Sequence, residues 1–176
     1  MMRRTLLALV IAAVACSGST DPDPVEPQSA LHFLTPNPGA PGLVSDTVRF
    51  YAVPGQDRSA SLVYTDSTPF LTFDVPPEAL TQTDSVLITI AIADSAQLIV
   101  GFEPSGLQFR NGHPAQLTLS FAHADSGLTA GNELKLSLWG QEHPGQNWHQ
   151  VPSNLDKQAM TVTGRIDGFT VYATAY

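Results

Sequence analysis

The alternation of apolar and polar residues between positions 101 and 122 constrains this fold more than any other feature of the sequence. Leu107 and Phe109 alternate with polar neighbours, and the segment 115–121 (AQLTLSF) continues the same pattern. Turn-forming residues separate these pieces at 103–106 (EPSG) and 111–114 (NGHP). A period of two is typical of a strand with one buried face. The stretch therefore predicts three strand pieces joined by turns.

Strand-like segments recur through the rest of the chain, separated by Gly, Pro, Asn and Asp. They lie at 47–53, 60–64, 70–75, 85–93, 98–102, 133–139, 148–151, 159–166 and 169–175. After residue 16, apolar residues nowhere keep a helical spacing for three turns. We therefore predict an all-β fold, an antiparallel β-sandwich of about seven to ten strands with almost no helix in the mature chain. The segment 85–93 is nearly all apolar, so we expect it to be central in its sheet or buried on both faces.

The alternation also predicts which side chains form the core. We expect seven of them to be buried: Ile88, Ile90, Leu117, Leu119, Phe121, Val162 and Val171. Replacing Phe121 by alanine should cost about 3 kcal/mol or more, the usual scale for emptying an aromatic core site.

The first fifteen residues have the layout of a signal peptide, which we assign to 1–15. Two arginines, Arg3 and Arg4, precede an unbroken apolar run at 6–14 that is too short to span a bilayer as a helix. Ala15 then precedes Cys16, the only cysteine of the chain. This start resembles a bacterial lipoprotein signal, which implies that Cys16 is lipidated and becomes the new N-terminus. An ordinary secretory signal with an incidental cysteine is the alternative.

The lone cysteine supports the lipoprotein interpretation, because an exported chain with one cysteine has no internal disulfide to form. Two or more acyl chains would give stable anchoring. The segment 16–30, rich in Pro, Ser and Asp, is expected to be a disordered tether that follows the lipidated Cys16. Residues 31–176 are then expected to form a single β-sandwich domain. This organisation predicts export and anchoring in the cell envelope, at the outer membrane or the cell surface.

The charge balance argues against a nucleic-acid partner. The chain carries 16 acidic and 8 basic residues, a formal net charge of −8. Removal of Arg3 and Arg4 with the leader leaves six basic residues and a net charge of −10. Nucleic-acid binding relies on basic patches, which so acidic a chain is poorly suited to provide.

Seven segments in order resemble one known domain type: 71–80 (LTFDVPPEAL), 86–90 (VLITI), 102–109 (FEPSGLQF), 115–121 (AQLTLSF), 133–138 (ELKLSL), 148–153 (WHQVPS) and 162–173 (VTGRIDGFTVYA). The pattern resembles the zonula-occludens/uncoordinated-five (ZU-five) domain over residues 70–176. The resemblance implies a β-sandwich that binds or scaffolds other proteins. Residues 31–64 lie outside it and are expected to add strands at one edge.

Some ZU-five relatives cleave themselves at a His-Phe-Ser motif in the last strand. The matching residues here are Gly168, Phe169 and Thr170, so the position of the histidine is occupied by glycine. A hydroxyl is a weak nucleophile without a neighbouring base. We therefore expect Thr170 to be an ordinary strand residue and the chain to stay intact.

Other catalytic or metal-binding chemistry has no sequence support. The chain lacks a G-x-S-x-G elbow, an H-E-x-x-H motif and a glycine-rich phosphate loop. Its five histidines lack a metal-ligand spacing, and no carboxylate pair stands out as a general acid and base. We therefore expect no enzyme activity, no cofactor and no metal.

The best candidate contact surface is the hairpin around residues 140–147. Trp139 and Trp148 are expected to face each other across it, with Val151 opposite Leu136, while His143 and His149 add polar contacts. Two exposed indoles would form a platform for a sugar or a peptide; the alternative is an aromatic pair covered by a loop or by the N-terminal strands.

The sequence thus predicts a membrane-tethered envelope lipoprotein displaying a β-sandwich that acts as an interaction or structural module. The expected partner is an envelope protein or a glycan. The membrane is a further partner, because the N-terminal lipid is expected to anchor the protein in it. A glycan-binding module is the alternative function, and a hydrolase is a distant third.

Overall fold

The computed structural model describes residues 31–125, 135–143 and 145–176. The leader 1–15, Cys16, the tether 16–30 and the start of the segment 133–139 lie outside these residues. The described chain forms thirteen strands and contains no α-helix. Within it, no helix has the length and apolarity that crossing a membrane requires.

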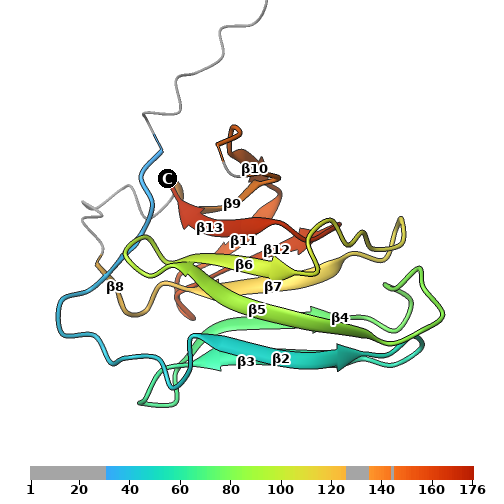
Figure 1. Cartoon of the computed structure of the whole chain (residues 1–176). Coiled ribbons are helices and arrows are strands. Elements are labelled where there is room, and N and C mark those ends of the chain that lie inside the picture. The colour runs from blue at the N-terminus through green and yellow to red at the C-terminus, as the bar shows by residue number, and fades with distance from the viewer. Residues whose placement is uncertain (1–30, 126–134, 144) are drawn as a thin grey trace, which may run out of the picture.

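Two antiparallel sheets face each other and form a β-sandwich, as predicted (Figure 1). The six-stranded sheet has the order β10 (His149–Val151), β9 (Ser137–Gln141), β13 (Val171–Ala175), β6 (Ile99–Glu103), β5 (Val86–Asp94), β2 (Thr47–Ala52). The five-stranded sheet has the order β11 (Ser153–Asp156), β12 (Thr161–Ile166), β7 (Ala115–Ser120), β4 (Pro69–Val75), β3 (Arg58–Val63). Two short strands, β1 (Thr35–Pro36) and β8 (Ala124–Asp125), pair with each other apart from the two main sheets.

The predicted strands lie close to the observed ones, with two differences. The middle piece of the segment 101–122 is not a strand, because its only β-pairing is one isolated bridge, between Gln108 and Gly168. Leu107 and Phe109 are nevertheless buried, so the alternation came from a loop that packs two side chains into the core. The second difference is that three short strands, β1, β8 and the polar β11, lie outside the predicted segments.

One side of the sandwich consists of strands from the segment 31–64, as expected. There β2 is the outermost strand of the six-stranded sheet, and β3 is the outermost strand of the five-stranded sheet. Strand β5 is flanked on both sides in the six-stranded sheet, by β2 and β6, which confirms its predicted place within the sheet. The alternative expectation, that β5 is buried on both faces, was wrong. Ile90 on one face is fully buried, whereas Leu87 on the other face is 45% exposed.

The core confirms five of the seven residues predicted to be buried: Ile88, Ile90, Leu117, Leu119 and Val162. Phe121 and Val171 are only half-buried. Phe121 follows the last residue of β7, where the chain turns away from the sheet, so it packs at the margin of the core. On β13, Tyr172 is the residue that faces the core, and its neighbour Val171 therefore lies on the outer face.

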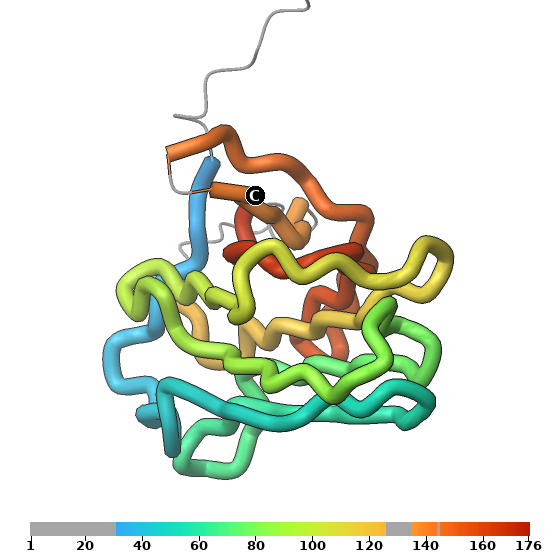
Figure 2. Tube along the Cα trace, turned by 45° about the vertical axis from the view of Figure 1, so that its right-hand side comes forward, coloured from blue at the N-terminus to red at the C-terminus, as the bar shows by residue number. Residues whose placement is uncertain are grey.

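The sandwich has two different ends. At the N-terminal end, Phe33 pairs with Ala175, and the backbones of His32 and Tyr176 exchange two hydrogen bonds. At the loop end lie the turns that follow β2, β4, β6, β9 and β12. Figures 1 and 2 both show the blue N-terminal segment beside the C-terminus and the yellow loop after β6 on the opposite side.

Replacing Phe73 by alanine should lower the free energy of unfolding by about 3–5 kcal/mol, because a large buried ring leaves a cavity that the sandwich cannot close. Phe73 is fully buried between the sheets. Phe121 is the matched control: it is only half-buried, so replacing it by alanine should lower the free energy of unfolding clearly less. Urea unfolding of both variants measures the difference, and equal losses would contradict this description of the core.

Candidate functional site

A hollow of about 490 Å³ opens at the loop end of the sandwich, beside the β9–β10 hairpin. Three parts of the chain line this end hollow: residues 105–108 after β6, the hairpin residues 142–143 and 149–150, and residues 165–170 between β12 and β13. The floor includes Phe169 and Tyr172, both 4% exposed, so the hollow sits directly on the end of the hydrophobic core.

Two of the four predicted contact residues line the end hollow. His143 and His149 are both exposed there, and His143 with Glu142 also borders a smaller hollow of about 320 Å³ on the outer face of the six-stranded sheet. Trp139 and Trp148 line neither hollow. The histidines of the hairpin, rather than its indoles, therefore border the end hollow.

The register of the β9–β10 hairpin differs from the predicted one by two residues. Gln150 lies opposite Trp139, and Val151 lies opposite Leu138 rather than Leu136. The reason is that β9 extends to Gln141, where it is also paired with β13, so the loop begins later than the sequence suggested. A shift of two keeps every side chain on its predicted face, and only the partners change.

The two tryptophans do not form an aromatic platform. Trp148 packs against Phe33 of the N-terminal segment, with ring centroids 4.9 Å apart and an interplanar angle of 60°. Trp139 is half-buried, and its Nε1 is buried with no partner among the described residues. Neither indole is free to stack on a sugar. Trp148 is covered by the N-terminal segment, which was one of the two expected alternatives.

Gly140 lets Tyr172 and His149 approach each other at the hairpin side of the end hollow. A Cβ at position 140 would lie 3.1 Å from Cε1 of Tyr172 and 3.2 Å from Cε1 of His149. The Tyr172 hydroxyl donates a 2.6 Å hydrogen bond to the carbonyl oxygen of Gly168. Burial, followed by the negative charges of Asp167 and Glu142, raises the pKa of Tyr172. The phenol is therefore a permanent donor that fixes the β12–β13 turn.

The end hollow has a polar lining of hydrogen-bond donors and acceptors. Gln108, Gln150 and Arg165 are donors, and Glu142 and Asp167 are acceptors. Within the described part of the chain, the one ion pair joins His123 Nε2 to Asp66 Oδ2 at 3.0 Å, and it lies near the N-terminal end. No histidine of the hollow is thus paired with a carboxylate, as a general base with an orienting partner would be.

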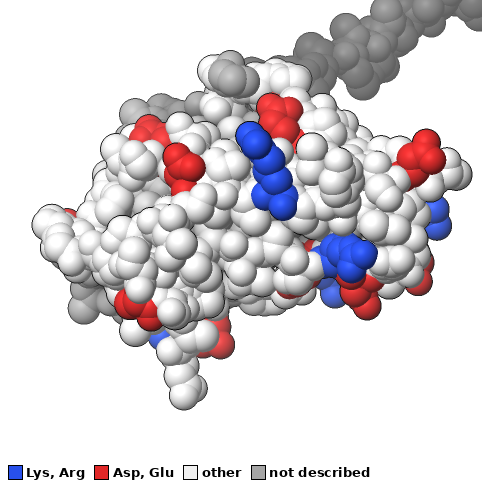
Figure 3. All heavy atoms as spheres, turned by 60° about the horizontal axis from the view of Figure 1, so that its bottom comes forward, with Lys and Arg blue, Asp and Glu red and all other residues white. Residues whose placement is uncertain are grey.

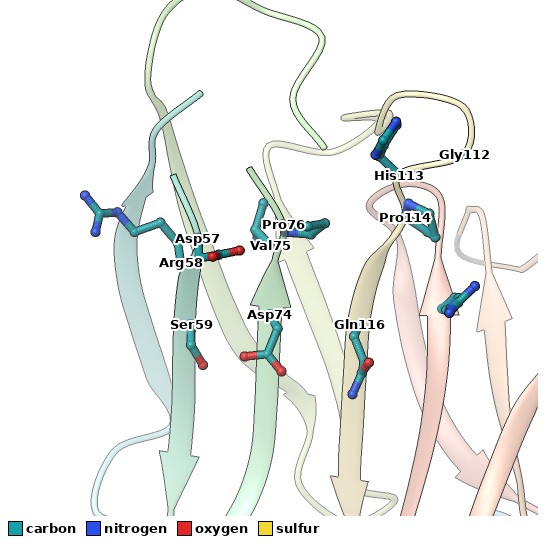
Figure 4. A pocket seen from close by; sticks show the side chains of 11 residues that line it. Asp57, Arg58, Ser59, Asp74, Val75, Pro76, Gly112, His113, Pro114 and Gln116 are labelled. Carbon is teal, nitrogen blue, oxygen red and sulfur yellow. The ribbon is translucent and has the colours of Figure 1, made fainter. Parts of the chain in front are cut away.

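A second hollow, of about 660 Å³, lies on the outer face of the five-stranded sheet near the same end. Ser59, Asp74 and Gln116 lie in register on β3, β4 and β7 and form a polar row across it. Figure 4 shows this row side by side, with His113 on the loop above Gln116 and Arg58 pointing away. We call this the face hollow.

Arg165 is the residue that the sequence reasoning missed. It lies on β12 next to Gln116 of β7 and lines both the end hollow and the face hollow. In the sequence it reads as one polar residue of an alternating strand. Its place between the two hollows comes from the register of strands far apart in the chain, which no local pattern shows.

The triplet Gly168, Phe169 and Thr170 is not arranged for self-cleavage. The Thr170 hydroxyl donates to the carbonyl oxygen of Gln141, across to β9. The carbonyl oxygen of Phe169 accepts a hydrogen bond from the Gly106 N–H at 3.3 Å. At Gly168, a Cβ would lie 2.8 Å from the backbone oxygen of Leu107, so a histidine does not fit there without moving the backbone.

Among the residues that the structure describes, no three His, Cys, Asp or Glu side chains are arranged to hold a metal ion. No protein-family model matches the chain, and no curated protein matches it significantly.

The tryptophan emission should be blue-shifted from that of free indole, and iodide should quench it weakly, because both indoles are half-buried. Replacing Phe33 by alanine should uncover Trp148, shift the emission to the red and increase quenching. Leu87→Ala, an exposed apolar control, should leave the spectrum unchanged. Full quenching in the unchanged chain would show that the indoles are exposed and would support the open aromatic platform instead.

Replacing Gly168 by alanine should lower the melting temperature, because the new methyl group meets the Leu107 carbonyl oxygen as well as the Gln108 side chain. Gln108→Ala should rescue only part of the loss, since the backbone contact remains. Complete rescue would show that the clash with the Gln108 side chain alone causes the loss of melting temperature.

The purified chain should run as one intact band on a denaturing gel after long incubation, because neither a base nor a free Thr170 hydroxyl is available for cleavage. Thr170→Ala is the control and should behave identically. A fragment that begins at Thr170 and is absent from the control would contradict this account.

Proposed function

We propose that this chain is an exported, membrane-tethered lipoprotein of the cell envelope whose β-sandwich acts as a protein-interaction or structural module. The single observation that carries the proposal is Cys16, the only cysteine, placed directly after a basic and apolar leader. Lipid on Cys16 would hold the domain at a membrane through the segment 16–30.

The arrangement of the domain supports this proposal. The described chain starts at the N-terminal end of the sandwich, beside the C-terminal residue Tyr176. The end hollow and the face hollow lie at or near the loop end. A tether attached at one end leaves the other end pointing away from the membrane, where loops on a rigid sandwich commonly carry recognition.

The expected partner is an envelope protein. The ZU-five-like pattern over 70–176 implies binding or scaffolding of proteins. The charges in Figure 3 are scattered, of both signs and set in a largely uncharged surface, so the face shown has no basic patch of the kind that nucleic acid needs. We expect neither catalysis nor a cofactor for this module.

A glycan at the cell envelope is the second candidate. The amides Gln108 and Gln150 and the carboxylates of the end hollow are groups that bind sugar hydroxyls. The aromatic stacking surface common in sugar recognition is missing from it, since Phe169 and Tyr172 are buried and the indoles pack elsewhere. We therefore favour a protein over a glycan as the partner.

Mass spectrometry of the membrane fraction should find acyl chains on a protein that begins at Cys16, because the thiol is the predicted attachment site. Cys16→Ser should release the protein into the soluble fraction, while Ser17→Ala, the neighbouring control, should not. An unmodified Cys16 recovered from the soluble fraction of cells would contradict the proposed anchor.

A further inference from the structure

Arg165 lies where the end hollow and the face hollow meet. It is exposed on the outer face of β12, and it lines both hollows. On one side it adjoins the row formed by Gln116, Asp74 and Ser59, which crosses the five-stranded sheet. On the other side lie the loop residues that line the end hollow. The two hollows therefore adjoin at Arg165, and we call the pair the Arg165 groove.

The guanidinium of Arg165 has no carboxylate partner within 4.0 Å among the described residues, where the one ion pair is His123–Asp66. An arginine side chain is always charged and offers five N–H donors in a planar fork. Such a fork binds a carboxylate through two parallel hydrogen bonds. Arg165 is therefore the part of the groove best able to hold an anionic group of a ligand.

Arg58 also borders the face hollow, but four acidic side chains of the groove limit how acidic this ligand is. Asp57 and Asp74 lie on the side of the face hollow, and Glu142 and Asp167 lie on the side of the end hollow. Like charges repel a polyanion that would run along the whole groove. One carboxylate flanked by neutral groups avoids this repulsion, and the amides of Gln108, Gln116 and Gln150 match the polar backbone of such a ligand.

We propose that the Arg165 groove binds an extended polypeptide segment of an envelope partner through one carboxylate, supplied by an Asp or Glu side chain. A polypeptide is favoured over an acidic glycan because the lining offers amides and buried aromatic rings but no exposed ring for a sugar to stack on. The inference rests on the proposed interaction role of the module, and it names the recognised group.

The experiment is an NMR titration of the ¹⁵N-labelled full chain, extracted from membranes in detergent. One probe is a blocked hexapeptide with a single central Asp; its matched probe carries Asn instead. A third probe is tetragalacturonate, an acidic sugar chain. The signals followed are the Arg165 Nε–H and the backbone amides of Gln116 and Gln150, one on each side of the groove.

We expect the Asp peptide to shift these signals and the Asn peptide to bind about tenfold more weakly or worse, the scale of losing a charge-assisted pair. Arg165→Gln should abolish the difference between the peptides, and Arg165→Lys should restore it only in part, because an ammonium lacks the fork. Arg49→Gln, an exposed arginine on β2, is the control that should bind like the unchanged chain.

Equal affinity for the Asp and Asn peptides, or no site-specific shifts, would overturn the proposal. Shifts with tetragalacturonate alone would replace the polypeptide by an acidic glycan and overturn it as well. The titration does not depend on acylation, since an unmodified Cys16 would leave the groove unchanged. Failure of the groove and failure of the anchor are therefore distinguishable.

Discussion

The packing of Phe73 is the interaction on which the rest of this structure depends. Phe73 comes from the five-stranded sheet, and its ring lies 5.1 Å from that of Phe102 on the facing sheet. It also lies 5.8 Å from Phe169 and 6.4 Å from Phe109, which belong to two loops rather than to strands. One buried ring thus holds together both sheets and the loops that close the sandwich at one end.

The same aromatic core anchors the loops at this end. The Phe109 N–H donates to the Asp167 carbonyl at 2.7 Å, and the Phe169 N–H donates to the Leu107 carbonyl at 2.8 Å. Because the side chains of Phe109 and Phe169 are anchored in the core, this backbone pairing fixes the positions of Gln108 and Asp167, which both line the end hollow. The proposed contact surface is therefore an extension of the core, even though loops form much of it.

The sequence predicted the strands well because each strand buries one face, so its alternation is a local property. It failed where long-range contacts decide. Leu107 and Phe109 alternate like a strand but pack from a loop, and Val171 lies outside because the turn before β13 makes Tyr172 the inward residue. The predicted register of the β9–β10 hairpin was wrong because pairing with β13 extends β9 to Gln141, so that the loop begins later. Arg165 gains its role only from neighbours on other strands and loops.

The central claim is that the module is held at one end and recognises its partner at the other. Two exposed glutamines test it most directly: Gln116 lies in the face hollow near the loop end, and Gln158 follows β11 at the N-terminal end. A photo-crosslinking amino acid placed at each position in the host cell should give protein adducts from position 116 and none from position 158. Adducts from position 158 alone would contradict the account.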